Sequence, residues 1–274
     1  MSTWVNGRAG TRVDSRDRGF NYGDGLFETM RVRRRGVRFL DYHLERLDEG
    51  CRRLGFAGPS RRVLRQELNA AAARRVDGVL KLVVTRGVGE RGYRPTGKER
   101  VTRVVSLQPL AKPAEGAVIL RSARLCRLRL GVNKELAGLK TLNRLECVLA
   151  RAEWQDPEIW EGLLRDTDGY LVCGTMSNLF LRSGSALMTP KLDRCGVAGV
   201  MRRWVLETAG ALELRVRETR LRWNDVVKAD EVFMTNAVAG VVPLGSVQHG
   251  RTRLRFAEAT SSTSAALRRL LESQ

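Results

Sequence analysis

The chain of 274 residues has little histidine, and its cysteines are scattered. The two histidines, His43 and His249, argue against a histidine-based metal cluster and leave few bases for a serine or cysteine nucleophile. The five cysteines include no Cys-x-x-Cys pair, and their odd number argues against a disulfide framework or a zinc site. We therefore expect that the protein binds no metal. We also expect its chemistry to depend on residues other than these histidines and cysteines.

Long apolar runs are also missing. No run approaches the roughly 18 residues that a membrane-crossing helix requires. The first ten residues contain no apolar stretch of the signal-peptide type. The sequence therefore predicts a soluble, cytoplasmic protein with no membrane partner.

Acidic residues are outnumbered, 30 against 49 basic residues, which gives a formal charge of +19. Such a charge is typical of nucleic-acid-binding proteins. However, the basic residues are spread along the chain, and the aromatic residues, 6% of the total, do not alternate with them as a base-stacking surface would require. We therefore expect no nucleic-acid partner and interpret the arginines as a solvated surface that attracts an anionic substrate. A catalytically silent, basic, nucleic-acid-binding protein remains the alternative from another functional class.

Hydrophobic periodicity predicts an α/β (α+β) protein of two domains, a smaller N-terminal α/β domain and a larger C-terminal domain. The expected bounds are 1–108 and 116–274, joined by a linker at 109–115 that Pro109 and Pro113 flank. The predicted helices span 42–54, with Asp41 as its N-cap, 60–75, 142–155, 199–209 and 257–271. The main predicted strands span 26–32, 37–40, 78–85, 101–107, 117–122, 163–166, 170–173, 179–182 and 231–235.

One of the seven lysines has distinctive neighbours. Lys140 begins the segment Lys140-Thr-Leu-Asn-Arg-Leu-Glu146, in a weakly charged region just before a predicted helix. Burial there would lower the pKa of the amine and make it nucleophilic. Lys81, on a predicted strand, is the other candidate. The remaining lysines have polar, loop-like or turn contexts: Lys98, Lys112, Lys134, Lys191 and Lys228.

Four segments, in this order and spacing, resemble the fold type IV pyridoxal-phosphate enzymes. They are 18–31, 43–47, 136–146 and 196–202. This family includes branched-chain and D-amino acid aminotransferases and aminodeoxychorismate lyases, and the likeness extends from Asn6 to about Val242. It implies that pyridoxal 5'-phosphate is the cofactor and that Lys140 forms the internal aldimine and acts as a general base. It also implies a homodimer whose active site lies near the interface.

The resemblance further implies a set of cofactor-binding residues. The arginine of His43-Leu-Glu-Arg-Leu47, Arg46, would bind the cofactor phosphate, and a planar guanidinium suits that role. A solvated helix arginine is the alternative interpretation. The amides of Val200 and Met201, after a glycine-rich turn that opens a helix, would bind the same phosphate, because the first N–H groups of a helix attract anions. Asn236 and Ala237 would complete the phosphate site.

One position departs from the family pattern. Family members usually place a glutamate against the pyridine nitrogen, but this chain has Cys173 at that position, before Asn178-Leu-Phe180. A carboxylate keeps the nitrogen protonated and strengthens the electron sink, which a thiol does poorly. The substitution therefore predicts a weaker electron sink, or another group that serves instead.

Within the family, two segments favour the lyase. The Lys140 segment is one, and Thr85 to Tyr93, which resembles the lyases' interdomain loop, is the other. The implied reaction converts 4-amino-4-deoxychorismate into 4-aminobenzoate and pyruvate, a step of folate biosynthesis. Arg91 and Tyr93, together with Asn143 and Arg144, would bind this small dianionic substrate.

Two further interpretations accompany the lyase assignment. Thr29 would lie near the reacting ring, by resemblance alone. The loop at 86–97 could instead be a mobile hairpin that carries surface arginines. An aminotransferase for D- or branched-chain amino acids is the alternative function within the same fold.

Overall fold

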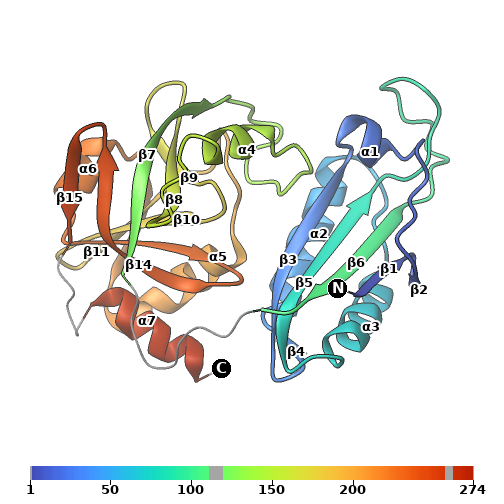
Figure 1. The fold of residues 1–274 in the computed structure, drawn as a ribbon, viewed down its shortest axis with the longest axis horizontal. Coiled ribbons are helices and arrows are strands. Elements are labelled where there is room, and N and C mark those ends of the chain that lie inside the picture. The colour runs from blue at the N-terminus through green and yellow to red at the C-terminus, as the bar shows by residue number, and fades with distance from the viewer. Residues whose placement is uncertain (1, 111–119, 257–261, 274) are drawn as a thin grey trace. The chain divides into compact units, whose positions relative to one another are not determined.

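The computed structural model describes residues 2–110, 120–256 and 262–273 (Figure 1). Contacts divide the chain into two units, Met1–Glu115 with Leu139–Asn143, and Gly116–Gly138 with Arg144–Gln274. In this division Leu139–Asn143 groups with the first unit, although it lies within the expected C-terminal domain, whose bounds stay a prediction. Residues 111–115 of the expected linker lie outside the described residues.

The first unit is an antiparallel sheet with the strand order β2-β1-β6-β5-β3-β4. Its strands are β1 (Ser2–Val5), β2 (Arg8–Ala9), β3 (Gly25–Arg33), β4 (Gly36–Val37), β5 (Asp77–Thr85) and β6 (Thr102–Gln108). The long strands β3 and β5 pair along their whole lengths, from Gly25 opposite Thr85 to Arg33 opposite Asp77. The expected strands at 26–32, 78–85 and 101–107 are thereby confirmed.

Helices α2 (Leu40–Arg53) and α3 (Arg61–Ala72) cover one face of this sheet (Figure 1). The alternation of β3 sends Leu26, Met30 and Val32 into the core, where they pack with helix residues such as Leu44 and Leu64. The same alternation places Glu28 on the core face, among apolar side chains.

The helix starts in this unit differ from the sequence predictions in detail. Helix α2 begins at Leu40 after Phe39, whose φ is 55°, so Asp41 lies in the first turn and is not the N-cap. Ser60 caps α3 by accepting a hydrogen bond from the Val63 amide. A short helix, α1 (Arg18–Tyr22), precedes β3, and the Asp17 carboxylate caps it by accepting from the Gly19 amide.

The second unit is a mixed sheet with the order β12-β11-β10-β13-β14-β7-β8-β9, to which β15 adds by pairing with β14. The strands are β7 (Arg121–Leu130), β8 (Ile159–Asp166), β9 (Leu171–Gly174), β10 (Asn178–Ser183), β11 (Ala186–Pro190), β12 (Arg215–Thr219), β13 (Glu231–Asn236), β14 (Gly240–His249) and β15 (Thr252–Arg255). The helices are α4 (Leu145–Arg151), α5 (Val200–Thr208), the 3-10 helix η1 (Ala209–Leu212), α6 (Trp223–Val227) and α7 (Thr263–Glu272).

Several sequence predictions for this unit are confirmed. The paired strands expected at 163–166 and 170–173 are β8 and β9, which pair antiparallel. The strand expected at 231–235 is β13, and the helix expected at 199–209 is α5. The mixed α/β fold is therefore as predicted. Strand β14, which pairs in parallel with β7, had not been predicted.

The helix predicted at 142–155 was wrong at both ends, because α4 spans only Leu145–Arg151. Its expected first turn is instead held in extended pairing by the first unit, where the Leu142 amide donates to the Gly25 carbonyl. The last helix also starts late, at Thr263, where the Glu231 carboxylate accepts from the Thr263 and Ser264 amides at 2.9 and 3.0 Å. Residues 117–119 and 257–261 of the predicted elements lie outside the described residues.

Candidate active site

Lys140 lies on a short segment that extends the edge of β3. The Phe27 amide donates to the Lys140 carbonyl at 3.0 Å, and the Leu142 amide donates to the Gly25 carbonyl at 3.0 Å. Between them, Thr141 forms an antiparallel bridge with Leu26. The backbone from the Lys140 carbonyl to Leu142 is therefore fixed to the first unit's sheet.

The Lys140 side chain is half-buried and lies over an aromatic ring. Its Nζ is 4.2 Å from the centroid of the Phe27 ring. Thr29 is two residues along β3 and therefore on the same face of the strand, paired with Lys81. The exposed Lys81 Nζ is 5.4 Å from the Phe27 centroid, so two amines lie near one ring. Such contacts are favourable for a cation.

Glu28 forms a buried cluster with two residues of α2. Arg46 donates from Nε to Glu28 Oε1 at 2.8 Å and from Nη2 to Oε2, and His43 Nδ1 lies 2.6 Å from Oε2. Glu28 and His43 are 2% and 0% exposed. The Arg46 guanidinium thus has a carboxylate partner in this structure, and its expected role at a phosphate stays a prediction.

The charges of this cluster follow from its surroundings. Burial raises the pKa of Glu28, but Arg46 and His43 outweigh burial and bring that pKa down to about 2. Burial lowers the pKa of His43 below its usual value, against the opposing effect of Glu28. At neutral pH, Glu28 is therefore ionised and His43 neutral, and the neutral imidazole needs its proton on Nδ1 to donate to the carboxylate. The sequence analysis did not predict this cluster. Its signal was Glu28, a glutamate at a core-facing position between the apolar residues Leu26 and Met30.

Arg91 and Tyr93 are exposed on the loop that connects β5 to β6. The buried Arg18 guanidinium holds this loop, donating to the Gly92 and Tyr93 carbonyls at 2.9 and 2.8 Å and to Asp24 at 2.9 Å. Tyr93 is 85% exposed, and its ring meets the Tyr22 ring edge-on, with 5.4 Å between the two centroids. The loop's backbone is therefore anchored, and its two candidate side chains are available to a ligand.

Cys173 is buried on β9 of the second unit. Burial, followed by the nearby Cys147 and Cys195 thiols, raises the pKa of Cys173 well above its ordinary value. The side chain is therefore a neutral thiol. The nearby Glu161 carboxylate is fully buried and already accepts five hydrogen bonds, from the Gly162, Thr175 and Met176 amides and from the Thr175 and Ser177 hydroxyls.

Val200 and Met201 begin helix α5, and both are buried. Their N-cap, Gly199, has no side chain to accept from the first amides, and no acidic residue lies in the first turn. A Cβ at Gly199 would collide with Asn178 Oδ1, so a larger residue there would displace the Asn178 side chain. The Asn178 side chain in turn donates to the Val197 carbonyl at 2.8 Å. The helix start thus presents N–H groups without a side-chain cap, which suits an anion.

Asn236 is the last residue of strand β13 and Ala237 follows it, and both are partly exposed. Asn236 Oδ1 accepts from the Val238 and Ala239 amides at 3.0 and 2.7 Å, so this side chain already closes a turn. Sequence reasoning missed Thr235, which precedes them. Its hydroxyl is buried and has no hydrogen-bond partner among the described residues.

Asn143 and Arg144 belong to different units. Asn143 is exposed in the first unit and lies close to Gly23, where a Cβ would collide with its Oδ1. Arg144 precedes α4 in the second unit, near enough to Cys173 to oppose the rise of the thiol's pKa. Among the described residues, no group of three or more His, Cys, Asp or Glu side chains could hold a metal ion.

Comparison with known proteins shows the family of this chain. The family model for class IV aminotransferases matches residues 25–247. The chain belongs to the class IV aminotransferase family. A family member, the aminodeoxychorismate lyase of Vibrio harveyi, is 34% identical over 256 residues, which cover 92% of this chain and 94% of the relative. A putative branched-chain-amino-acid aminotransferase of Methanocaldococcus jannaschii is 31% identical over 89% of this chain and 87% of its own length.

A solved structure extends the likeness to the whole chain. The 4-amino-4-deoxychorismate lyase of Pseudomonas aeruginosa matches with a TM-score of 0.90 and 42% identity, covering 99% of this chain and 98% of that one. The expected fold type IV architecture is thereby confirmed. No helix in the described ranges is long and apolar enough to cross a membrane.

Replacing Glu28 with glutamine should destabilise the first unit, because the partly buried Arg46 guanidinium then loses the charge of the carboxylate to which it donates. We expect a loss of about 3 kcal/mol in the free energy of unfolding at neutral pH, measured by urea titration. The folded-state pKa of Glu28 is lowered from 4.5 to about 2, so its contribution is complete above pH 4.5 and is lost as the pH falls toward 2. The difference between the proteins should shrink over that range.

Glu49→Gln is the matched control, since this exposed α2 glutamate pairs only with the exposed Arg52 among the contacts described. It should leave the urea midpoint almost unchanged. Equal effects of the two substitutions, or a Glu28→Gln effect that does not depend on pH, would contradict the role assigned to the cluster.

Proposed function

We propose that this chain is a pyridoxal-phosphate-dependent lyase that converts 4-amino-4-deoxychorismate into 4-aminobenzoate and pyruvate. The observation that carries the proposal is the placement of the Lys140 amine, half-buried over the Phe27 ring on a segment fixed by two backbone hydrogen bonds. The 34% and 42% identities to proteins named as this lyase support the choice of reaction.

The residues present fit the cofactor. The amides of Val200 and Met201, at a helix start without a side-chain cap, would hold its phosphate. The unpartnered Thr235 hydroxyl lies next to Asn236 and Ala237, which would close the same phosphate site. Lys140 would hold the cofactor covalently, and Arg46, which donates to the Glu28 carboxylate in this structure, would also contact the phosphate.

Pyridoxal phosphate supplies an electron sink for charge that develops beside the substrate nitrogen. In our proposal, Lys140 Nζ, freed from the cofactor once the substrate amine replaces it, would take the proton from the ring carbon that bears that amine. The bond between the ring and the enolpyruvyl oxygen then breaks, and the electron pair leaves with the oxygen. Protonation of the released enol gives pyruvate, and the remaining ring is aromatic. Thr29, on the same face of β3 as Phe27, would lie beside that ring.

The substrate carries two carboxylates, which suits a chain with a formal charge of +19. Arg91 and Tyr93 are the proposed anchors, because the loop that bears them is fixed by Arg18 while their side chains stay exposed. Asn143 and Arg144 would contribute further polar contacts. We place the protein in the cytoplasm, where thiols stay reduced, since no disulfide joins any of its five cysteines.

The direct test is a product assay with purified protein, pyridoxal phosphate and 4-amino-4-deoxychorismate. We expect equal amounts of 4-aminobenzoate and pyruvate, and loss of both products in the Lys140→Ala variant. Lys81→Ala is the matched control, because its amine also lies near the Phe27 ring but would stay outside the chemistry. A cofactor-loaded protein that forms neither product, but transfers the amino group of an amino acid to 2-oxoglutarate, would replace the proposal with an aminotransferase.

A neutral Cys173 thiol would favour elimination over transamination. Elimination ends in an aromatic ring and tolerates a weak sink, whereas reversible amino transfer gains from a protonated pyridine nitrogen. In Cys173→Glu we expect amino transfer from D-alanine to 2-oxoglutarate to rise at least about ten-fold, with lyase turnover reduced. The absorbance of the bound cofactor should also change its pH dependence.

Cys173→Gln is the control, since glutamine matches glutamate in size without its charge. It should resemble the parent protein in amino transfer and in the cofactor spectrum. If Cys173→Glu binds cofactor and behaves like Cys173→Gln in both measurements, the thiol has no tuning role.

We also propose a homodimer whose interface lies near the active site and includes helix α4. Three apolar side chains on α4 are exposed at helical spacing, Leu145 at 75%, Val148 at 61% and Leu149 at 61%. A second copy of the chain would cover this face. Sedimentation should give about twice the chain mass of 30.7 kDa, and Leu149→Asp should shift the protein toward the monomer. A parent protein that sediments as a monomer would refute this part of the proposal.

A further inference from the structure

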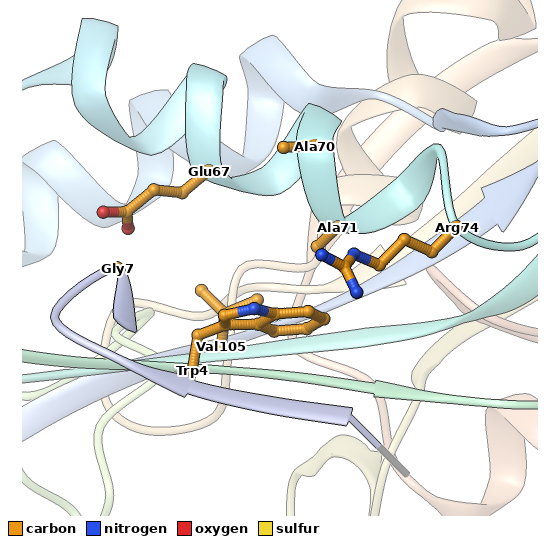
Figure 2. Close-up of a pocket in the computed structure, with 7 residues that line it drawn as sticks. All are labelled: Trp4, Gly7, Glu67, Ala70, Ala71, Arg74 and Val105. Carbon is orange, nitrogen blue, oxygen red and sulfur yellow. The ribbon is translucent and has the colours of Figure 1, made fainter. Parts of the chain in front are cut away.

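A pocket of about 230 Å³ lies between helix α3 and the strands β1 and β6 of the first unit (Figure 2). The half-buried Trp4 indole and the buried Val105 form its sheet side, and Ala70 and Ala71 form its helix side. The two alanines leave room that longer side chains would fill. The volume is below the roughly 300 Å³ at which sites for drug-sized ligands begin, so it suits a single small ring.

The two ends of the pocket carry opposite charges, but only one is balanced. Arg103 neutralises Glu67 through three contacts, Nε to Oε2 at 2.8 Å, Nε to Oε1 at 3.0 Å and Nη2 to Oε1 at 2.7 Å. At the other end, the Arg74 guanidinium lies over the Trp4 ring, 5.2 Å from its centroid (Figure 2). The pocket therefore has a net positive charge beside an aromatic face.

Arg74 differs from other arginines of this protein that lie over a ring. Its guanidinium makes no hydrogen bond or ion pair with any residue in the described ranges, so its N–H edge is open. The others each also donate to a carbonyl or carboxylate oxygen: Arg18, Arg86, Arg151, Arg220 and Arg222.

We infer that this pocket binds a small aromatic carboxylate, with its ring against Trp4 and its carboxylate on the Arg74 guanidinium. The planar fork of an arginine matches the two oxygens of a carboxylate, and the indole offers a flat apolar surface to a second ring. The balanced Glu67 at the far end does not compete for Arg74. No residue of the proposed catalytic machinery lines the pocket, so the inference goes beyond the proposed function and does not require it.

The test uses benzoate as the probe and the Trp4 indole N–H resonance of cofactor-loaded, 15N-tryptophan-labelled protein as the readout. The Trp4→Phe variant assigns that resonance by removing it. Benzoate should shift the Trp4 resonance in a saturable manner. Benzylamine, which has the same ring and the opposite charge, should not shift it.

Two variants locate the binding site. Arg74→Gln should weaken benzoate binding about ten-fold or more, because it removes the charge-assisted hydrogen bonds. Ala70→Leu should weaken it by filling the space. Arg75→Gln, which removes a neighbouring exposed arginine that does not line the pocket, should bind like the parent protein. All three should load cofactor and form product as the parent does.

Three results would overturn the inference: a Trp4 resonance that benzoate leaves unchanged, equal binding by Arg74→Gln and the parent, or equal shifts by benzylamine and benzoate. Because the readout reports on Trp4 and the product assay reports on Lys140, failure of one proposal is distinguishable from failure of the other.

Discussion

The active-site proposal depends on the pairing of residues 140–142 with the edge of β3. Two backbone hydrogen bonds, from Phe27 to Lys140 and from Leu142 to Gly25, attach this segment to the first unit, although its sequence neighbours on both sides belong to the second. The pairing places the Lys140 amine over the Phe27 ring. The Lys140 position is therefore set by the sheet and not by the flexibility of a loop.

The two faces of strand β3 have different roles. Phe27 and Thr29 lie on the face near Lys140, whereas Glu28, between them, points into the core and holds His43 and Arg46 of α2. An ionised carboxylate is tolerated there because Arg46 compensates its charge and His43 donates to it. This buried cluster ties the strand to the helix, so the same strand both supports the lysine and is itself fixed.

Features that depend on local periodicity could be predicted from the sequence. The alternation along β3 and β5 and the apolar spacing of α2 give the first unit, and the β8–β9 pair follows from two apolar runs around Asp168 and Gly169. Features that depend on tertiary contacts could not. The sequence pattern of the segment before α4 predicts a helix, but hydrogen bonds to β3 hold that segment extended. Likewise, the carboxylate partner of Arg46 lies on a strand, 18 residues away in the sequence. The roles of the cofactor-binding residues came from family resemblance and not from pattern.

The most direct test of the account asks which lysine binds the cofactor. The protein would be loaded with pyridoxal phosphate, reduced with borohydride to fix the cofactor to its lysine, digested, and mapped by mass spectrometry. We expect a single cofactor-modified peptide, with the added mass on Lys140. Modification of Lys81 instead, or no stable adduct in a folded protein that still forms 4-aminobenzoate, would contradict it.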